Sequence, residues 1–157
     1  MRDITRRAFA SGAAAFALAA SAPLIADEKP KIAIYKSPTC DCCQKWADHL
    51  SAAGFATDVI DRGSLTALKT EWGVPTALRS CHMGKIDGYV IEGHVPAAAI
   101  KRLLAERPQA VGLAVPGMPI GSPGMEGGKP EIYNVVLFGA AGETVFGRFQ
   151  GENELSK

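Results

Sequence analysis

Four cysteines are the residues of this chain best suited to chemistry. Cys40, Cys42 and Cys43 stand within four residues of one another, and Cys81 is the fourth. Cys40 and Cys43 have the C-x-x-C spacing, which serves both disulfide exchange and metal binding because the thiolate is the reactive form in each. A third cysteine beside a redox pair would risk misoxidation, whereas a thiolate cluster can use it. The cluster therefore favours a soft metal ion, and sulfur ligands select Cu(I), Zn(II) or an iron–sulfur cluster.

Histidines and methionines supply further candidate metal ligands. Met118 and Met125 lie in a segment rich in Gly and Pro, and their thioethers move the preference from Zn(II) towards Cu(I) or Ag(I). The alternative is that both methionines fill gaps in the core. His82 and His94 are either ligands or ordinary buried or surface histidines. The complete set of candidate metal ligands is Cys40, Cys42, Cys43, Cys81, His82, His94, Met118 and Met125.

The cysteine cluster needs a local structure that holds it. The alternating residues 31–36 predict a strand, and apolar residues at helical spacing from Cys43 to Leu50 predict a helix that starts near Thr39 or Cys40 and ends at Gly54. The free N–H groups and the dipole at the start of a helix stabilise thiolate. This position supports both metal binding and disulfide exchange.

A hairpin is predicted to bring Cys81 to His94. Asp87-Gly88 is a strong signal for a two-residue turn between residues 81–86 and 89–94. Counting outward from the turn places Cys81 opposite His94, at the open end of the hairpin, provided that no bulge occurs. On a regular strand, His82 points to the opposite face from Cys81.

The remaining segments complete the predicted fold. We expect a strand over 56–61, a short helix capped by Ser64 and ending at Trp72, a helix from Pro96 to about Arg107, a long ordered loop over 111–130, a closing hairpin of residues 133–138 and 144–149, and a frayed C-terminus. This order predicts an α/β fold with a thioredoxin- or glutaredoxin-like central sheet flanked by helices and an extra C-terminal β-hairpin.

The first 26 residues have the composition of an export signal. Three arginines precede an uncharged apolar run, 9–20, that is too short to span a membrane. Arg6 and Arg7 resemble a twin-arginine motif, although a general secretory signal with two arginines is an alternative. We therefore expect a signal peptide over 1–26 and one thioredoxin-like metal-binding domain over 27–157, located in the periplasm.

Charge excludes several classes of partner. The net charge is +1, and it becomes −1 without residues 1–26, which carry three arginines and one aspartate. We expect no nucleic-acid partner and no membrane span after signal cleavage.

An oxidising compartment also permits two disulfides, for which Cys40–Cys43 with Cys42–Cys81 is the expected pattern, because a vicinal Cys42–Cys43 bond is rare.

Several motifs resemble the periplasmic copper-resistance proteins sometimes called CopG-like, long labelled a domain of unknown function. The resemblance covers nearly the whole chain after residue 26. It departs at Met83, where threonine is expected. It implies a thioredoxin-like fold, export and copper binding at the cysteines. The motifs that carry it are Cys40-Asp41-Cys42-Cys43, Ser80-Cys81-His82, residues 88–96 (GYVIEGHVP), residues 116–119 (PGMP) and residues 121–126 (GSPGME).

Two functions follow as hypotheses. The first is a periplasmic protein that binds Cu(I) or Ag(I) for copper handling or resistance and exchanges copper with other periplasmic copper proteins. The second is a thiol–disulfide or copper-linked oxidoreductase, with Cys40 as nucleophile and Cys43 as resolving cysteine. An arsenate-reductase-like role is disfavoured, because no anion-binding arginine is evident near Cys40.

Overall fold

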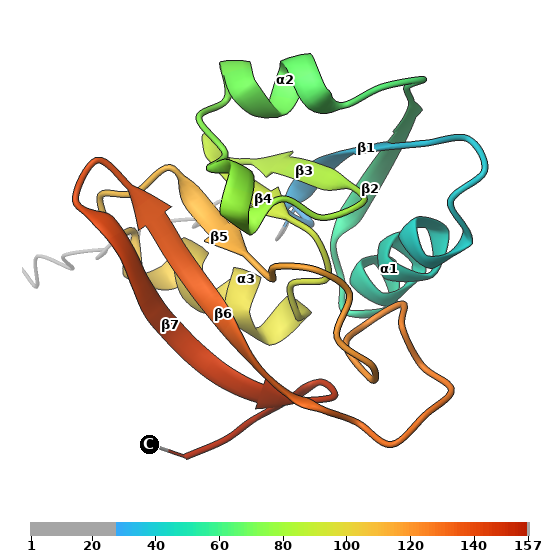
Figure 1. The fold of residues 1–157 in the computed structure, drawn as a ribbon, viewed down its shortest axis with the longest axis vertical. Helices are drawn as coiled ribbons and strands as arrows, with labels where there is room; N and C mark the ends of the chain where they lie inside the picture. The colour runs from blue at the N-terminus through green and yellow to red at the C-terminus, as the bar shows by residue number, and fades with distance from the viewer. Residues whose placement is uncertain (1–27, 157) are drawn as a thin grey trace, which may run out of the picture.

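A computed structural model describes residues 28–156. The order of helices and strands confirms the predicted α/β architecture (Figure 1). The expected signal peptide lies outside the described residues. The elements are β1 (Lys31–Lys36), α1 (Asp41–Ala52), β2 (Ala56–Asp61), α2 (Thr66–Glu71), the 3-10 turn η1 (Thr76–Leu78), β3 (Met83–Ile86), β4 (Tyr89–Glu92), α3 (Ala97–Glu106), β5 (Gly112–Ala114), β6 (Ile132–Gly139), β7 (Gly142–Gln150) and β8 (Asn153–Glu154).

One eight-stranded sheet, in the order β2-β1-β3-β4-β5-β6-β7-β8, forms the centre of the molecule. β1 runs parallel to β2 and antiparallel to β3. Side chains of α1 and α3, such as Leu50 and Ile100, pack on one face of the sheet in the main core. A smaller core on the other face contains Met83 and Val90 and packs against Leu68 of α2. The sheet is therefore flanked by helices on both faces, as predicted.

The predicted hairpin register is confirmed. Ile86 pairs with Tyr89 and Met83 with Glu92. Asp87 and Gly88 have φ values of 50° and 89°, as expected for a turn in which both central residues adopt positive φ. The start of β3 and the end of β4 therefore lie side by side.

Three secondary-structure elements differ from the predictions: two strands that were not predicted and one helix that starts later. β5 lies inside the predicted loop 111–130, where it pairs with β4 and β6; three residues are too few to show a strand pattern. β8 replaces the expected frayed end, because the chain turns at Gly151 (φ 63°) and pairs with β7. α2 begins at Thr66 with Leu65 as N-cap, although Ser64 Oγ does accept a hydrogen bond from Thr66 N at 3.4 Å.

The segment between β5 and β6, residues 115–131, is the longest connection within the described chain and crosses to the start of α1 (Figure 1). A Cβ atom on Gly124 would lie 2.5 Å from the carbonyl oxygen of Cys42 and 3.1 Å from Trp46 N. The segment therefore packs directly on the first turn of α1. Within residues 28–156, no helix has the length and apolar character needed to cross a membrane.

Candidate metal centre

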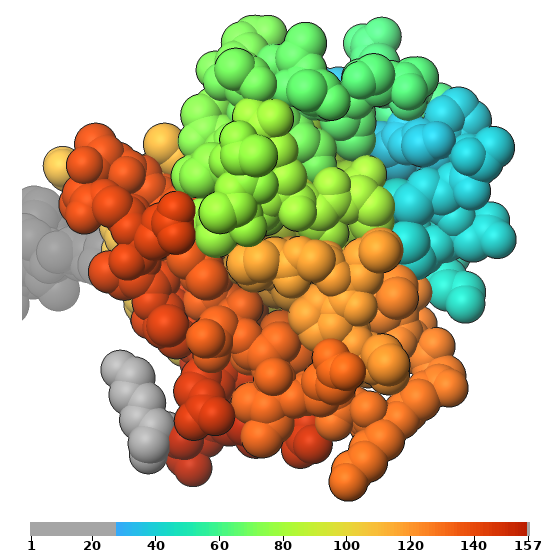
Figure 2. All heavy atoms as spheres, viewed as in Figure 1, coloured from blue at the N-terminus to red at the C-terminus, as the bar shows by residue number. Residues whose placement is uncertain are grey.

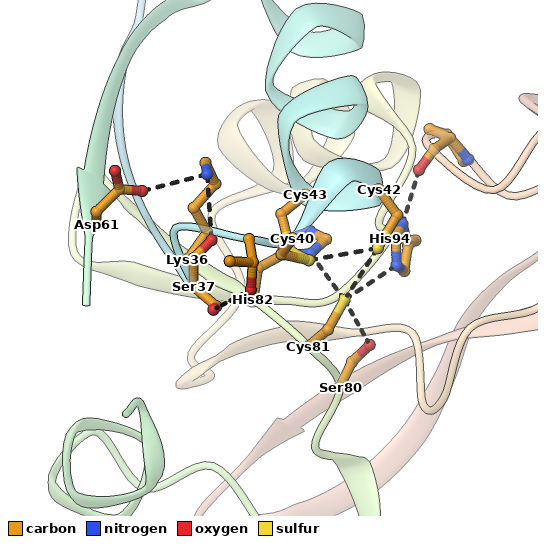
Figure 3. Close-up of a disulfide and its surroundings, with 12 residues drawn as sticks. Lys36, Ser37, Cys40, Cys42, Cys43, Asp61, Ser80, Cys81, His82 and His94 are labelled. Carbon is orange, nitrogen blue, oxygen red and sulfur yellow. Dashed lines mark hydrogen bonds and ion pairs between the residues drawn. A yellow bond between two sulfur atoms is a disulfide. The ribbon is translucent and has the colours of Figure 1, made fainter. Parts of the chain in front are cut away.

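The four cysteines meet where β1 turns into α1 and where β3 begins. Cys40 is the N-cap residue of α1, and Cys42 and Cys43 lie in its first turn. Cys40 and Cys43 form a disulfide. Cys42 and Cys81 are free thiols, with their Sγ atoms 3.7 Å apart. Cys42 Sγ also lies 3.4 Å from Cys40 Sγ, so Cys42 connects the disulfide to Cys81 (Figure 3).

His94 faces Cys81 from the other strand of the hairpin, as the register predicts. Its Nε2 atom lies 3.3 Å from Cys81 Sγ, and its Nδ1 atom lies 2.8 Å from the carbonyl oxygen of Pro123. A carbonyl only accepts hydrogen bonds, so Nδ1 carries the proton and Nε2 has a free lone pair. Histidines that bind metals commonly have this arrangement, with the second ring nitrogen donating to a carbonyl.

The prediction that His82 points away from Cys81 is wrong. His82 Nδ1 lies 3.2 Å from Cys81 Sγ. β3 begins only at Met83, so residues 81 and 82 precede the ladder and the alternation of a regular strand does not apply to them. The His82 ring packs against Trp46 in a tilted arrangement, with the ring centroids 4.4 Å apart, and its Nε2 atom is buried without a hydrogen-bond partner in the described structure.

Burial sets the protonation of the groups around Cys81. Burial raises the pKa of the Cys81 thiol to about 11, and the neighbouring Cys42 adds to the rise. Burial lowers the pKa of His94, and it lowers the pKa of His82 well below its ordinary range, with His94 and Lys69 contributing further. At neutral pH the site therefore contains a protonated Cys81 thiol and two neutral imidazoles, whose lone pairs are available to a metal ion.

The two methionines lie in the β5–β6 connection, and their role as metal ligands stays a prediction. The side chain of Met118 is 53% exposed, and Met125 is half-buried. Between the two methionines, Pro123 and Gly124 bring backbone to the site, where they contact His94 and the first turn of α1. The connection therefore contributes the carbonyl group of Pro123 to the surroundings of His94.

A buried ion pair, Lys69–Glu92, holds the backbone of Ser80, next to Cys81, by hydrogen bonds. Lys69 of α2 and the backbone N–H of Ser80 both donate hydrogen bonds to Oε1 of Glu92, and Lys69 Nζ also donates to the carbonyl of Ser80 at 2.7 Å. Burial raises the pKa of Glu92, while the Lys69 ammonium opposes the rise. Sequence analysis missed this pair; a lysine at helical spacing in α2 has no signal that separates it from a surface lysine.

The donor atoms form two overlapping groups that fit a soft metal. One group is the four cysteine sulfurs, and the other is Cys81, His82 and His94; within each group the donor atoms lie within 4.8 Å of one another. Ligands 2.3 Å from a tetrahedral ion are about 3.8 Å apart, close to the 3.4 and 3.7 Å separations of Cys42 Sγ from its neighbours. The cluster is therefore capable of metal binding once the disulfide is reduced.

Three stretches of chain that are distant in sequence meet at this site. In the space-filling view, the segment carrying the first cysteines (blue to cyan), the segment near residue 80 (yellow-green) and the β5–β6 connection (orange) adjoin one another on one face (Figure 2). The half-buried state of Cys40, Cys42 and Cys81 agrees with a site that small solutes can reach.

Comparisons with known proteins agree with this geometry. Residues 78–125 match a family model described as "Protein of unknown function, DUF411". Two solved structures titled copper resistance protein CopG, Form 2 and Form 1, are both 44% identical to the chain. The alignments cover 78% and 79% of this chain and 99% and 100% of those chains, with TM-scores of 0.74 and 0.73. No curated protein matched the chain. At this identity, over almost the full length of the solved structures, the chain belongs to the CopG family of copper resistance proteins.

Proposed function

We propose that this protein binds Cu(I), and also Ag(I), in the periplasm, as part of copper handling or resistance. The observation that carries the proposal is the position of Cys42, whose sulfur lies within 3.7 Å of both Cys40 and Cys81 and so joins four sulfurs into one donor group. Cys40, Cys42, Cys43 and Cys81 are the proposed principal ligands, and the lone pairs of His94 and His82 complete the set at Cys81.

Copper is favoured over zinc on two grounds. Thiolate-rich sites suit Cu(I), and the homologous solved structures are named copper resistance proteins. Met118 is largely exposed, so its thioether is open to solvent rather than enclosed at the cluster. Met118 and Met125 therefore remain proposed only as accessory sites where a metal ion is first captured.

The disulfide favours a second candidate function, thiol–disulfide or copper-linked oxidoreduction. Cys40 is half-buried and Cys43 is fully buried, so an incoming thiolate would attack at Cys40 and Cys43 would leave as the resolving thiol. Opening this bond takes two electrons and two protons and supplies two of the four proposed copper ligands. Copper binding and the redox state of this pair are therefore linked.

A competition experiment tests the metal proposal. The protein, reduced and kept anaerobic, is titrated with Cu(I) against a chromogenic Cu(I) chelator, and separately with Zn(II) against a Zn(II) indicator. We expect at least one equivalent of Cu(I) to bind, with tighter affinity than Zn(II). Tighter retention of Zn(II) would refute the copper assignment. The same titration of the oxidised protein should show weaker binding, since two sulfurs are then in the disulfide.

Location in the periplasm follows from the proposed signal peptide over residues 1–26, and other periplasmic copper proteins are the proposed exchange partners. Replacement of Arg6 and Arg7 by lysine should block export through the twin-arginine route, because that route requires the arginine pair. Cell fractionation with an antibody to the protein measures this. Undiminished export would instead assign the signal to the general secretory route.

A further inference from the structure

A cavity of about 300 Å³ lies beside Cys81. Its walls come from Ser37 after β1, residues 62–66 before and at the start of α2, Lys69 of α2, and residues 79–81 before β3. This volume is at the lower end of the range for small-molecule sites, about 300–1,000 Å³. The cavity therefore suits a small molecule and shares the Cys81 wall with the cysteine cluster.

The lining of this cavity is positively charged. Arg62, Lys69 and Arg79 line it, and no aspartate or glutamate side chain does. Lys69 is neutralised by the buried Glu92, and the nearby Asp61 pairs with Lys36 at 3.2 Å. Arg79 lies close enough to Glu92 to lower the pKa of that carboxyl, but neither Arg62 nor Arg79 forms an ion pair with an acidic side chain among the described residues.

The two arginines differ in how firmly they are held. Arg79 donates from Nε to the carbonyl of Val74 at 3.2 Å and from Nη2 to Thr70 Oγ1 at 2.9 Å, which fixes its guanidinium at the cavity. Arg62 is exposed and can swing towards a ligand. Guanidinium groups match the planar shape of a carboxylate. Sequence analysis found no anion-binding arginine near Cys40. The structure places Arg62 and Arg79 in the cavity that Cys81 lines, and Cys40 does not line this cavity.

Cys81 differs chemically from the arginines that line the same cavity, and this difference narrows the class of ligand. Cys81 offers a soft sulfur, while Ser37, Ser64 and Thr66 contribute hydroxyl groups elsewhere in the lining. A ligand that satisfies the whole cavity carries an anionic oxygen group for the arginines and a soft atom for Cys81. A simple oxyanion would satisfy only the first requirement.

We propose that this cavity binds a small thiol that also carries a carboxylate, and that this thiol delivers Cu(I) to Cys81. The inference rests on the proposed function and adds the class of copper donor. Delivery is a ligand exchange in which the Cu–S bond to the small thiolate breaks and a Cu–S bond to Cys81 forms. The Cys81 proton passes to the departing thiolate, and copper stays in the +1 state, so no oxidant or reductant is needed.

Binding can be tested without copper and without thiol exchange. S-methylglutathione, which keeps both carboxylates but has no free thiol, is titrated into the protein and amide shifts are followed by NMR. We expect saturable shifts at residues 62–66 and 79–81. Arg62→Ala should weaken binding by about threefold to tenfold, the range for losing a partly exposed charged contact, and Arg62→Lys should recover part of it. The diethyl ester of the same ligand, which lacks the carboxylates, should bind more weakly.

Arg148→Ala is the matched control, because Arg148 is also exposed but lies on β7 and does not line the cavity. Its affinity for S-methylglutathione should equal that of the unaltered protein. Equal binding by Arg62→Ala and the unaltered protein, equal binding of the ester and the acid, or shifts confined to other residues would overturn the proposal.

Delivery is tested separately with reduced protein and Cu(I)–glutathione in a stopped-flow experiment. Arg62→Ala should slow copper transfer by about threefold to tenfold, in line with the lost binding, while its equilibrium Cu(I) affinity against a chelator stays unchanged. An unchanged transfer rate would overturn the delivery step. Failure of the unaltered protein to take Cu(I) from a chelator would overturn the proposed function, whereas binding of S-methylglutathione is decided without copper.

Discussion

The Sγ atom of Cys81 lies 3.3 Å from Nε2 of His94, although the two residues are thirteen positions apart in the chain. The Asp87-Gly88 turn and the regular pairing of β3 with β4 produce this proximity. The hydrogen bond from His94 Nδ1 to Pro123 then fixes the tautomer and the orientation of the ring. A third segment of chain thereby sets which nitrogen faces the sulfur.

Replacement of His94 should weaken copper binding without unfolding the protein. We expect His94→Gln to lower the Cu(I) affinity of the reduced protein by at least about tenfold, equivalent to about 1.4 kcal/mol, because the nitrogen donor beside Cys81 is lost. Competition with a Cu(I) chelator measures it. His49→Gln is the control: His49 contacts Glu152 and the backbone N–H of Ala97, and the glutamine retains an acceptor. Equal affinities of the two variants would remove His94 from the site.

Serine variants of the cysteines separate the two candidate functions. If metal binding dominates, Cys42→Ser and Cys81→Ser should both reduce copper affinity and stoichiometry sharply, because each removes a sulfur from the shared donor group. If oxidoreduction dominates, only Cys40→Ser and Cys43→Ser should abolish disulfide exchange. Copper stoichiometry and insulin reduction are measured on the same four proteins. Unchanged copper binding by Cys42→Ser and Cys81→Ser would rule out a four-sulfur site.

The alkylation of Cys81 should depend on pH in an unusual way. In the oxidised, metal-free protein, burial raises the pKa of Cys81 to about 11, so the unreactive thiol predominates at neutral pH. The rate of modification by iodoacetamide, followed by mass spectrometry of the Cys81 peptide, should still be rising at pH 10. Cys42→Ser should shift the midpoint to lower pH, because Cys42 itself raises the pKa of Cys81. A midpoint at or below the ordinary thiol value in the unaltered protein would contradict this.

Replacement of only one member of the Lys69–Glu92 ion pair should lower the free energy of unfolding strongly. Glu92→Leu leaves the Lys69 ammonium buried without a counter-charge, and we expect it to lower the free energy of unfolding by about 3–5 kcal/mol. The double variant Lys69→Met/Glu92→Leu should lose much less, because both charges disappear together. Urea denaturation of the unaltered protein, both single variants and the double variant gives the coupling energy. Additive effects would show that the two residues do not act as a pair.

Two glycine variants can separate the effect of close packing between the β5–β6 connection and α1 from the effect of positive φ. Gly124→Ala and Gly127→Ala both place alanine at positive φ, 90° and 118°, but only at Gly124 would the new Cβ meet backbone, at 2.5 Å. Positive φ alone costs alanine about 1–2 kcal/mol. Gly124→Ala should therefore be the more destabilising variant in thermal unfolding, and it alone should perturb the His94 ring resonances. Equal effects would indicate that the connection is free to move away from α1.

The sequence was most informative where local geometry decides position. The turn chemistry of Asp87-Gly88 fixes the register of β3 and β4, and helical spacing after Cys43 fixes α1, so the proximity of Cys81 and His94 followed by counting. His82 could not be placed in the same way. Its side chain points to Cys81 because the ladder between β3 and β4 begins only at Met83, one residue later, and residue types do not signal where a ladder begins.

Contacts between segments that are distant in the chain could not be predicted from the sequence. Nothing in residues 62 or 79 indicates that their guanidinium groups share a cavity with Cys81, because the connections on either side of α2 determine where they lie. The two methionines are a second example. Their chemistry suits copper, but residue types could not indicate that the same segment brings the carbonyl of Pro123 to His94.

The contact of Pro123 with His94 also limits how far this centre can be moved into another scaffold. A graft of residues 40–52 would transfer three of the four sulfurs and no imidazole from the hairpin. A larger graft ending after α3 would include His94 but leave its Nδ1 atom without the carbonyl that selects the tautomer. A transplanted centre would need the β5–β6 connection as well, together with a glycine at the point where that connection touches the helix. The smallest portable unit is therefore almost the whole described chain.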